Sequence, residues 1–277
     1  MPEGPEVKYL VDYLNKQLKN NKITDIIIHG GRYKRHKNLY NENLKIIFPL
    51  KINKIECHGK FIYWDLEKYI LFNTLGMSGW WIYEKEKHSN IEFKLSKCSI
   101  YFNDYRNFGT LKFCTRDNLD KKLKELGPDI LSTENLTLEF EKILNKKRKE
   151  TNIGAAIMDQ KVAAGCGNYL RSECLYIAKI SPFRKIKDLS KDEIYKIWDI
   201  LNQLGWLYYN EKKGKKLGII NSKYVLQNKY LKHGPSNYKR DQGYFLVYRQ
   251  EKDPFGNKVI SEKINSRMVH YVNNIQK

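Results

Sequence analysis

The chain has few cysteines, no long apolar run and no targeting pattern. Its five cysteines contain no CxxC pair, which favours free thiols in a reducing compartment over a disulfide framework or a cysteine zinc site. No apolar run approaches the ~20 residues of a transmembrane helix, and the acidic N-terminus lacks the pattern of a signal peptide. We therefore expect no membrane partner, no metal and no cofactor. The expected localisation is intracellular, nuclear or cytoplasmic, with a viral setting left open.

Acidic residues are also scarce relative to basic ones. The 277 residues include 51 Lys and Arg against 31 Asp and Glu, a formal net charge of +20. A field of that size attracts polyanions, with nucleic acid as the first candidate and an anionic membrane surface as the second. The basic residues do not concentrate on one amphipathic helix, which disfavours the membrane surface. Codon bias in a low-GC genome would also raise the Lys content, so composition alone does not decide.

Hydrophobic residues make up 41% of the chain, enough for a packed core, and their periodicity changes along it. Apolar residues of the first twenty share one helical face, short β-branched and aromatic runs follow from Ile23 to Phe113, and helical periodicity extends from Asp117 to Tyr238. The expected helices in that last region are 135–147, 153–161, 168–178 and 190–210. The order of these patterns predicts a leading helix, a β-sandwich or barrel, and then a helical region.

The last stretch of the chain has strand-like composition. Residues 244–250 and 258–264 are expected to pair as a hairpin around the turn sequence 253-DPFGN. We therefore predict a multi-domain α and β protein with domains at 1–120, 121–243 and 244–277. The long loop at 212–243 has no evident role.

The opening MPEGPEV carries the most chemical information. Removal of Met1 would leave Pro2 with a secondary amine at the N-terminus, and an α-amino group, with a pKa of about 7.7–8.0, is more often neutral near pH 7 than a lysine. Attack of that amine on a sugar C1′ gives an iminium ion that permits β-elimination. Glu3 and Glu6 lie at the start of the first helix and could move protons. The alternative is an ordinary helix cap.

Four residues are further candidates: Lys60 at the start of an expected strand, and three others on short turns. Lys60 follows His-Gly in 58-HGKF, Met77 lies in the glycine turn 75-LGMSG, and 105-YRNFG offers Arg106 and Phe108. A flexible apolar side chain on such a turn suits a gap in a base stack. Taken singly, each favours an ordinary role. Lys60 would be a solvent-facing lysine and Met77 core filling, while Arg106 and Phe108 would be a surface arginine and a packed phenylalanine.

The segment 159-DQKVAAGCGNYLRSE predicts a helix end, a glycine turn and a new helix. Asn168 is expected to cap that new helix, and backbone N–H groups at such a start bind phosphate readily. A helix–helix turn without a ligand is the alternative.

Together these motifs resemble the formamidopyrimidine-DNA glycosylase / endonuclease VIII family. PEGPEV, HGKF, LGMSG, YRNFG, ELGPDIL and DQKVAAGCGNYLRSE occur in the family's order over nearly the whole chain. The resemblance implies a β-sandwich, a helical domain with a helix–two-turns–helix element, and a terminal β-hairpin finger. It also implies DNA with oxidised bases or abasic sites as the partner, double-stranded and also single-stranded, and a monomeric enzyme.

The resemblance assigns a role to each of these residues. Pro2 would form the Schiff base, Glu3 would protonate the sugar or base and open the deoxyribose ring, and Glu6 would support the site. Lys60 would hold a phosphate near the lesion and assist β-elimination, and Asn168 would hold backbone phosphates.

The void left by a flipped base would be filled from the two later turns. The resemblance gives this role to Met77, Arg106 and Phe108. The family usually has two arginines before Phe-Gly, whereas this chain has Arg106-Asn107. That departure predicts a weaker contact to the strand opposite the lesion.

The tail departs further from the usual pattern. Most relatives carry a four-cysteine zinc finger, but here Val272 and Ile275 stand where the last two cysteines would be, and neither supplies a zinc donor. The tail and the GNYLRSE run resemble the zincless finger of eukaryotic endonuclease VIII-like 1 enzymes. Arg267 matches the finger arginine that contacts the lesion phosphate and is linked to δ-elimination.

The predicted activity is base excision of oxidised pyrimidines with strand cleavage by β,δ-elimination. Two alternatives stay open: a purine-directed enzyme acting on formamidopyrimidines or 8-oxoguanine, and a non-catalytic DNA-binding relative.

Overall fold

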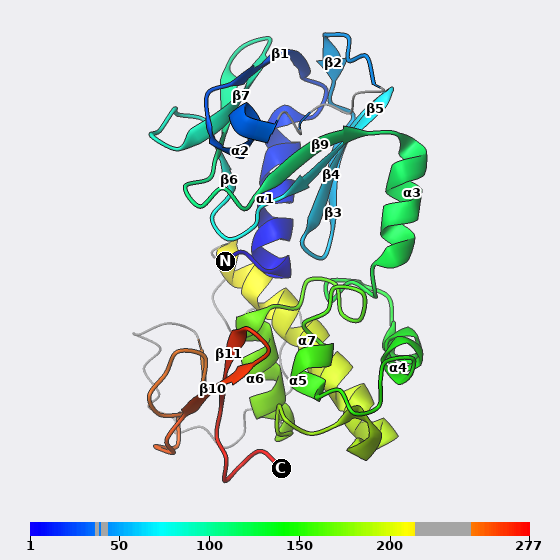
Figure 1. The fold of residues 1–277 in the computed structure, drawn as a ribbon, viewed down its shortest axis with the longest axis vertical. Coiled ribbons are helices and arrows are strands. Elements are labelled where there is room, and N and C mark those ends of the chain that lie inside the picture. Colours follow the sequence, from blue (N-terminus) through cyan, green and yellow to red (C-terminus); the bar gives the residue numbers. More distant parts are fainter. Residues whose placement is uncertain (37–38, 40–43, 214–244) are drawn as a thin grey trace. The chain divides into compact units, whose positions relative to one another are not determined.

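The computed structural model describes residues 1–36, 39, 44–213 and 245–277. They form two compact units, Met1–Glu125 and Leu126–Lys277 (Figure 1). The loop expected at 212–243 lies outside the described residues except for its first two. Within the described ranges, no helix is long and apolar enough to cross a membrane.

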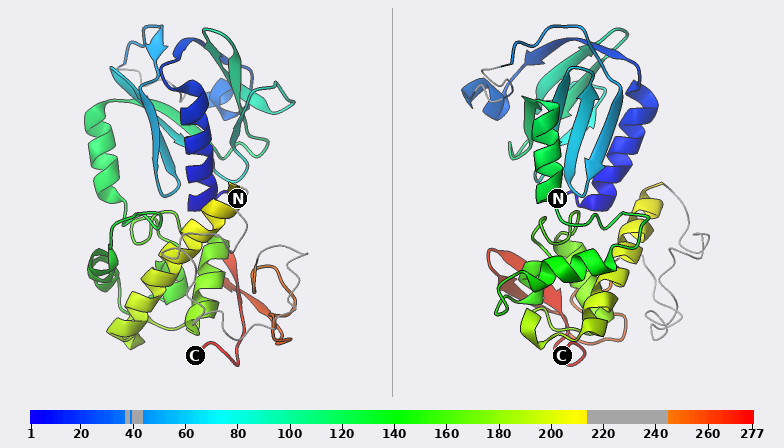
Figure 2. Two further views of the ribbon diagram at one scale, coloured as in Figure 1. Left: turned by 180° about the vertical axis from the view of Figure 1, so that it is seen from behind. Right: turned by 90° about the vertical axis from the view of Figure 1, so that its right-hand side faces the viewer.

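Unit 1 begins with the predicted amphipathic helix, α1 (Gly4–Leu18). Pro5 lies in its first turn, where the absent N–H would have had no partner in the helix. The apolar face predicted from the 3.6-residue period is buried: Val7, Leu10, Val11, Leu14 and Leu18. The helix is therefore held by packing of that face on the β-structure behind it (Figure 2).

Two antiparallel sheets form the predicted β-sandwich of unit 1. One has the order β2-β1-β7-β8-β6 and the other the order β3-β4-β5-β9. The strands are β1 (Lys22–Ile28), β2 (Leu50–Lys51), β3 (Lys54–His58), β4 (Phe61–Leu66), β5 (Tyr69–Thr74), β6 (Trp80–Ile82), β7 (Ser89–Leu95), β8 (Ser99–Asn103) and β9 (Thr110–Cys114). Two further helices, α2 (Gly31–His36) and α3 (Arg116–Glu125), complete the unit.

Aromatic side chains from both sheets fill the core between them. Trp64 of β4 lies 5.1 Å from Trp81 of β6 between ring centroids, and Trp81 lies 4.8 Å from Phe93 of β7. The indole N–H of Trp81 donates to the Asn73 side-chain oxygen at 2.9 Å, which satisfies a buried donor that would otherwise cost free energy. The inward residues of alternating strands thus form one continuous core.

Unit 2 contains the helical region. Its helices are α4 (Thr137–Asn145), α5 (Ile153–Ala156), α6 (Asn168–Ala178), the short 3-10 helix η1 (Ile186–Asp188) and α7 (Lys191–Lys212). The helix predicted over 153–161 is wrong beyond Ala156. Asp159 closes a turn there instead, because its carboxylate accepts the N–H of Lys161 and its carbonyl accepts that of Val162, which competes with helical hydrogen bonds.

The terminal hairpin exists, but its strands are not the predicted pair. β10 (Ile260–Ile264) pairs with β11 (Arg267–Tyr271), whereas residues 245–250 form no strand. The turn at 253-DPFGN does form, with a single bridge between Lys252 and Lys258. That turn ends the pairing, so the second strand of the hairpin comes from the segment that follows.

Hydrogen bonds and apolar packing hold this tail against α6. The Asp253 carboxylate, 4% exposed, accepts the N–H groups of Phe255 and Asn257 and the hydroxyl of Tyr176 at 2.9 Å. Val272, which stands at an expected cysteine position, is fully buried, and the Gln276 side chain accepts its N–H at 2.8 Å. Burial of Val272 and its hydrogen bond to Gln276 therefore hold this segment in place.

We expect Asp253→Ala to destabilise the protein by about 2–4 kcal/mol, because several buried donors lose their acceptor together. Urea unfolding measures the loss, and Glu251→Ala, at an exposed position two residues earlier, is the control that should stay within about 0.5 kcal/mol of wild type.

EDTA should leave the melting temperature of wild type unchanged. A melting temperature that falls with EDTA would mean that a metal holds the tail.

Candidate active site

Pro2, Glu3 and Glu6 lie together at the start of α1. Glu3 is the N-cap of the helix, and its side chain accepts the N–H of Glu6 while the Glu6 carboxylate accepts the N–H of Glu3 at 2.9 Å. Glu3 is only 2% exposed, whereas Pro2 is partly exposed. The capping role considered from sequence is thus real, and it fixes both carboxylates beside Pro2 without excluding a role in proton transfer.

The packing of α1 on β3 carries the Lys60 turn to the same end of unit 1. The Asn15 side chain exchanges hydrogen bonds with both backbone groups of Ile55, and the end of the helix lies beside Ile52, so helix and strand run antiparallel. From Asn15 back to Gly4 the helix advances about 16 Å, and from Ile55 to His58 the strand advances about 10 Å before the turn at Gly59 and Lys60 extends it further. The tip of the β3–β4 hairpin therefore reaches the level of the helix N-terminus (Figure 1).

The register of the four-stranded sheet brings two more turns to that end. Phe61 pairs with Thr74, and Thr74 pairs with Thr110, whose hydroxyl groups are 2.7 Å apart. Across three neighbouring strands these positions span about 10 Å. The turn at 75–79 and the turn at 104–109 therefore emerge beside the Lys60 turn.

Asp104 ties the two turns to each other. Its carboxylate accepts the hydroxyl of Ser78 and, at 2.7 Å, the N–H of Gly109, while the Ser78 oxygen accepts the N–H of Arg106 at 3.0 Å. A Cβ on Gly76 would lie 2.5 Å from the Phe108 carbonyl carbon, so only glycine permits this approach. The two turns form one rigid ledge, which we call the 75–79/104–109 ledge.

The ledge presents the side chains predicted to fill a base stack. Phe108 is 53% exposed and the Arg106 guanidinium lies 5.3 Å from its ring centroid, while Met77 is partly exposed. A large apolar side chain held out into solvent suits insertion between bases.

Asn107 explains the departure from the two-arginine pattern. Its φ of +57° lies in the left-handed region, which asparagine tolerates better than most residues, and its side-chain oxygen accepts from the Asn90 amide at 3.0 Å. Asn107 therefore shapes the turn.

In unit 2, the buried Arg171 joins Asn168 to the hairpin that carries Arg267. Arg171 is 1% exposed, and its guanidinium donates to the Asn168 side-chain oxygen and, at 2.8 Å, to the carbonyl of Met268. The expected cap is wrong: Gly167 is the N-cap, and Asn168 is the first residue of α6. Because Arg171 can only donate, the Asn168 oxygen must face it, and the amide NH₂ group is left to donate elsewhere.

Sequence reasoning missed the structural function of Arg171, Ser172 and Glu173. All three are at most 1% exposed. The Ser172 hydroxyl accepts the N–H of His270 at 3.2 Å, and the Glu173 carboxylate accepts three successive N–H groups of residues 246–248 at 2.7–2.9 Å. Three polar residues in a row within an apolar helix are the signal that could have identified them, since buried charges are almost always paired.

Arg267 is exposed at the end of the hairpin, beside the turn at 265–266. Over the residues that the structure describes, no group of three or more His, Cys, Asp or Glu side chains is placed to hold a metal ion. The chemistry available at these positions is that of amines, carboxylates, amides and guanidinium groups.

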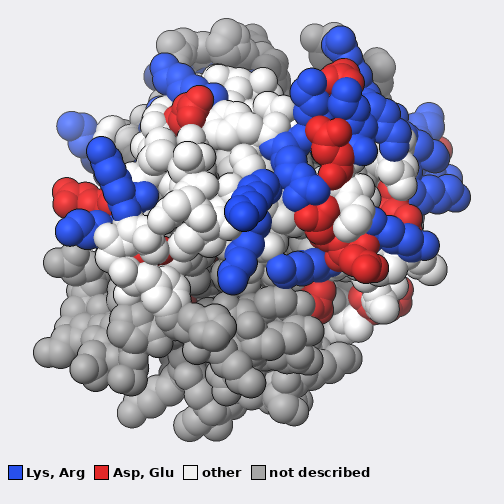
Figure 3. All heavy atoms as spheres, turned by 90° about the horizontal axis from the view of Figure 1, so that it is seen from below, with Lys and Arg blue, Asp and Glu red and all other residues white. Residues whose placement is uncertain are grey.

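The positive charge of the surface is partly offset by acids. Figure 3 shows Lys and Arg side chains gathered on one side of the face seen from below, with Asp and Glu among them. Glu150 pairs with Lys185 at 2.6 Å and with Lys187 at 2.7 Å, and these lysines lower the pKa of Glu150 to about 2. Net charge alone therefore overstates what the surface offers to a polyanion.

Comparison with known proteins identifies the family. The N-terminal domain of formamidopyrimidine-DNA glycosylases matches residues 1–111, their H2TH domain matches 126–204 and their C-terminal domain matches 238–277. The formamidopyrimidine-DNA glycosylase of Pelotomaculum thermopropionicum is 30% identical over all of this chain and 99% of its own length.

Solved structures show the same fold. MutM (Fpg) of Thermus thermophilus covers 99% of this chain and 98% of its own, with a TM-score of 0.76 and 24% identity. Lactococcus lactis Fpg, solved with DNA that contains an oxidised pyrimidine, covers 100% of both chains, with a TM-score of 0.75 and 23% identity.

Fold, matched domains and relatives define a DNA glycosylase of base excision repair that is also an AP lyase. The chain belongs to the formamidopyrimidine-DNA glycosylase family. The family-level resemblance is confirmed. Its endonuclease VIII-like 1 branch stays a prediction, since these relatives are named as formamidopyrimidine-DNA glycosylases or Fpg.

Glu173 makes stability depend on pH. Burial raises its pKa to about 7, although three backbone N–H groups lower it. The folded state then holds the proton more tightly than the unfolded chain. The contribution of Glu173 to the free energy of unfolding is therefore complete below about pH 4.5 and is lost as pH rises towards 7. We expect a fall on the order of 3 kcal/mol in the free energy of unfolding, measured with urea between pH 4.5 and 8. Glu173→Gln should lack this component, and parallel profiles for the two proteins would contradict it.

Proposed function

We propose that this glycosylase excises oxidised pyrimidines and cleaves the strand by β,δ-elimination through a Schiff base on Pro2. One observation carries the proposal: helix packing and sheet register bring the Pro2 end of α1, the Lys60 turn and the 75–79/104–109 ledge to one end of unit 1. A nucleophile, a phosphate ligand and a base-stack wedge at one end are the parts that excision of a flipped base requires.

Removal of Met1 frees the Pro2 nitrogen, which otherwise is an amide. The amine attacks C1′, the glycosidic C–N bond breaks, and the departing base takes a proton from Glu3. The attacking nitrogen gives its proton to the Glu3 carboxylate, which passes it to the ring oxygen as the C1′–O bond breaks. This gives the iminium ion, an electron sink that acidifies the C2′ proton. Removal of that proton expels the 3′ phosphate, and a second elimination expels the 5′ phosphate. Lys60, a cation beside this end of the helix, would neutralise the phosphate that departs first.

The ledge would hold the DNA open during this reaction. Met77 and Phe108 would enter the stack in place of the flipped base, and Arg106 would contact the orphaned partner base. The ledge is held by Asp104, so these side chains need little reorganisation on binding.

Unit 2 would supply the remaining phosphate contacts. The Asn168 amide has its NH₂ group turned away from Arg171, and phosphate oxygens accept such donors. Arg267, exposed beside the hairpin turn, would contact the lesion phosphate. Since Arg171 bonds to both segments, the two phosphate ligands would act as one unit.

The tail supports a pyrimidine preference. Val272 and Ile275 replace zinc ligands as in the endonuclease VIII-like 1 resemblance, and one structurally similar protein, the Lactococcus enzyme, was solved with oxidised-pyrimidine DNA. The second candidate is a purine-directed enzyme, which the name of the Pelotomaculum relative favours.

The nucleophile is tested by borohydride reduction in the presence of abasic-site DNA. We expect one covalent adduct that peptide mapping places on Pro2, a loss of at least about tenfold in adduct formation for Pro2→Gly, and a mature protein without Met1. Glu3→Gln should lose base excision, while Gln retains an acceptor for the helix cap. An adduct on a lysine, or full excision by the Glu3 variant, would refute these roles.

The lesion preference is tested with matched duplexes that differ in one base. We expect excision of thymine glycol to exceed that of 8-oxoguanine by more than about tenfold in kcat/KM. The abasic site is the control, because it bypasses base recognition. Strong 8-oxoguanine release without thymine glycol release would replace the proposal by the purine-directed candidate.

A further inference from the structure

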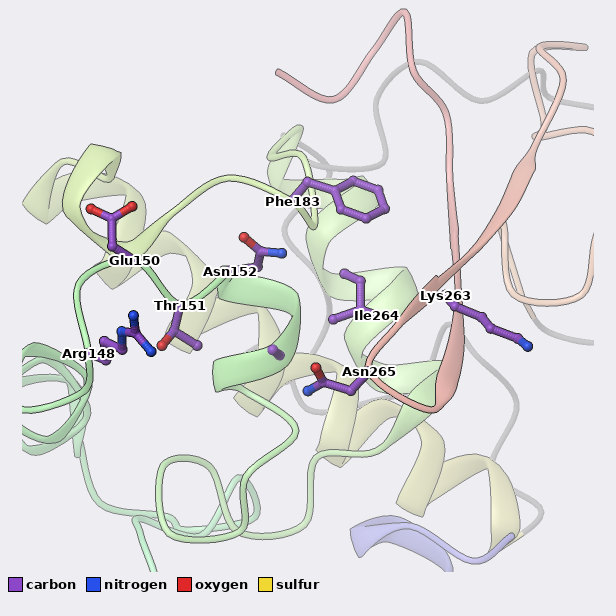
Figure 4. Close-up of a pocket in the computed structure, with 9 residues that line it drawn as sticks. Arg148, Glu150, Thr151, Asn152, Phe183, Lys263, Ile264 and Asn265 are labelled. Carbon is purple, nitrogen blue, oxygen red and sulfur yellow. The ribbon is translucent and has the colours of Figure 1, made fainter.

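An open pocket in unit 2 lies between the chain that follows α4 and the terminal hairpin. It has a volume of about 460 Å³ and is lined by Arg148, residues 150–152, Ala155, Phe183 and hairpin residues 263–265. Figure 4 shows Arg148 and Thr151 on one side and Ile264 and Asn265 on the other, while the Lys263 side chain points away. Polar groups thus line an opening whose floor is apolar.

The charge balance of this pocket is positive. No carboxylate among the described residues pairs with the Arg148 guanidinium. Glu150 also lines the pocket, but Lys185 and Lys187 pair with it at 2.6 and 2.7 Å. An exposed guanidinium, the Thr151 hydroxyl and neighbouring amides make a donor-rich site, which suits an anion with several acceptor oxygens.

Hairpin register places the pocket beside Arg267. Ile264, which lines the pocket, is the direct cross-strand partner of Arg267. Such partners have Cα atoms about 5 Å apart and side chains on the same face. Ile264 packs with Phe183 and Ala155 on the face towards the helices. Arg267 therefore begins on the pocket side of the hairpin.

We propose that Arg148 binds a DNA backbone phosphate in this pocket, next to the phosphate held by Arg267. The inference rests on the proposed function for the Arg267 contact and extends it to a further positioning residue. A continuous strand that binds Arg267 carries its next phosphates on to the neighbouring pocket, whereas a free anion would be held by the pocket alone. Guanidinium binds phosphate oxygens in a two-pronged geometry that lysine cannot reproduce.

Binding of an abasic-analogue duplex across a range of salt concentrations tests the charge. Arg148→Ala should bind about tenfold more weakly and reduce the slope of log K against log salt by about 0.9. Lys149→Ala is the matched control: Lys149 is the adjacent exposed cation and lies outside the pocket lining. It should bind nearly as wild type. Equal effects of the two substitutions would mean a general field and would overturn the proposal.

A walk of single neutral methylphosphonates along the lesion strand then locates the phosphate. One position should weaken wild type and Lys149→Ala but leave Arg148→Ala unaffected, because the contact is already lost. Absence of any such position overturns the pocket assignment. Borohydride adduct formation by wild type is measured in parallel. Its failure refutes the Pro2 mechanism alone, since phosphate binding does not require the imine.

Discussion

Three consecutive polar side chains of α6 are buried because each is paired with the C-terminal segment. Arg171, Ser172 and Glu173 reach the backbone at Met268, at His270 and at residues 246–248, respectively. A buried charge without partners costs several kcal/mol, so the helix and the tail stabilise each other or neither is stable in this form. The same guanidinium orients Asn168, and the proposed phosphate contacts of unit 2 therefore depend on this docking.

This docking also fixes the described part of the tail, residues 245–277, against α6. A zinc ion fixes four chain positions at once, whereas here several weaker contacts together fix the tail. Asp253 accepts the N–H groups of a turn, Gln276 closes the end of the chain, and Val272 is buried. Each hydrogen bond contributes about 1 kcal/mol or somewhat more to the free energy of unfolding, so the tail is stable only when these contacts form together. Stability of the tail then depends on packing against α6, whereas a zinc finger carries much of its own folding free energy.

Local patterns predicted most of the elements. The 3.6-residue period identified α1, and the motif order supplied the candidate site residues from Pro2 to Arg267, whose roles stay a prediction. Residue-level geometry depended on long-range pairing that no local pattern contains. Asparagine is a common N-cap residue, but the side-chain oxygen of Asn168 accepts a hydrogen bond from Arg171 instead. Residues 245–250 have strand composition, but the N–H groups of residues 246–248 donate to Glu173, which lies more than seventy positions away. The strand that pairs with β10 had to come from elsewhere.

Glu3 illustrates how one side chain can satisfy both a structural and a chemical demand. A helix start needs an acceptor for its first N–H groups, and the Glu3 side chain meets this need by accepting the N–H of Glu6. The capping box restrains its rotamer and seats it beside Pro2, within a nearly inaccessible position. A carboxylate held this way has little freedom to lose when substrate binds, which is the condition for effective proton transfer. The helix cap and the proposed catalytic role are therefore one arrangement, and the cap is what positions the acid.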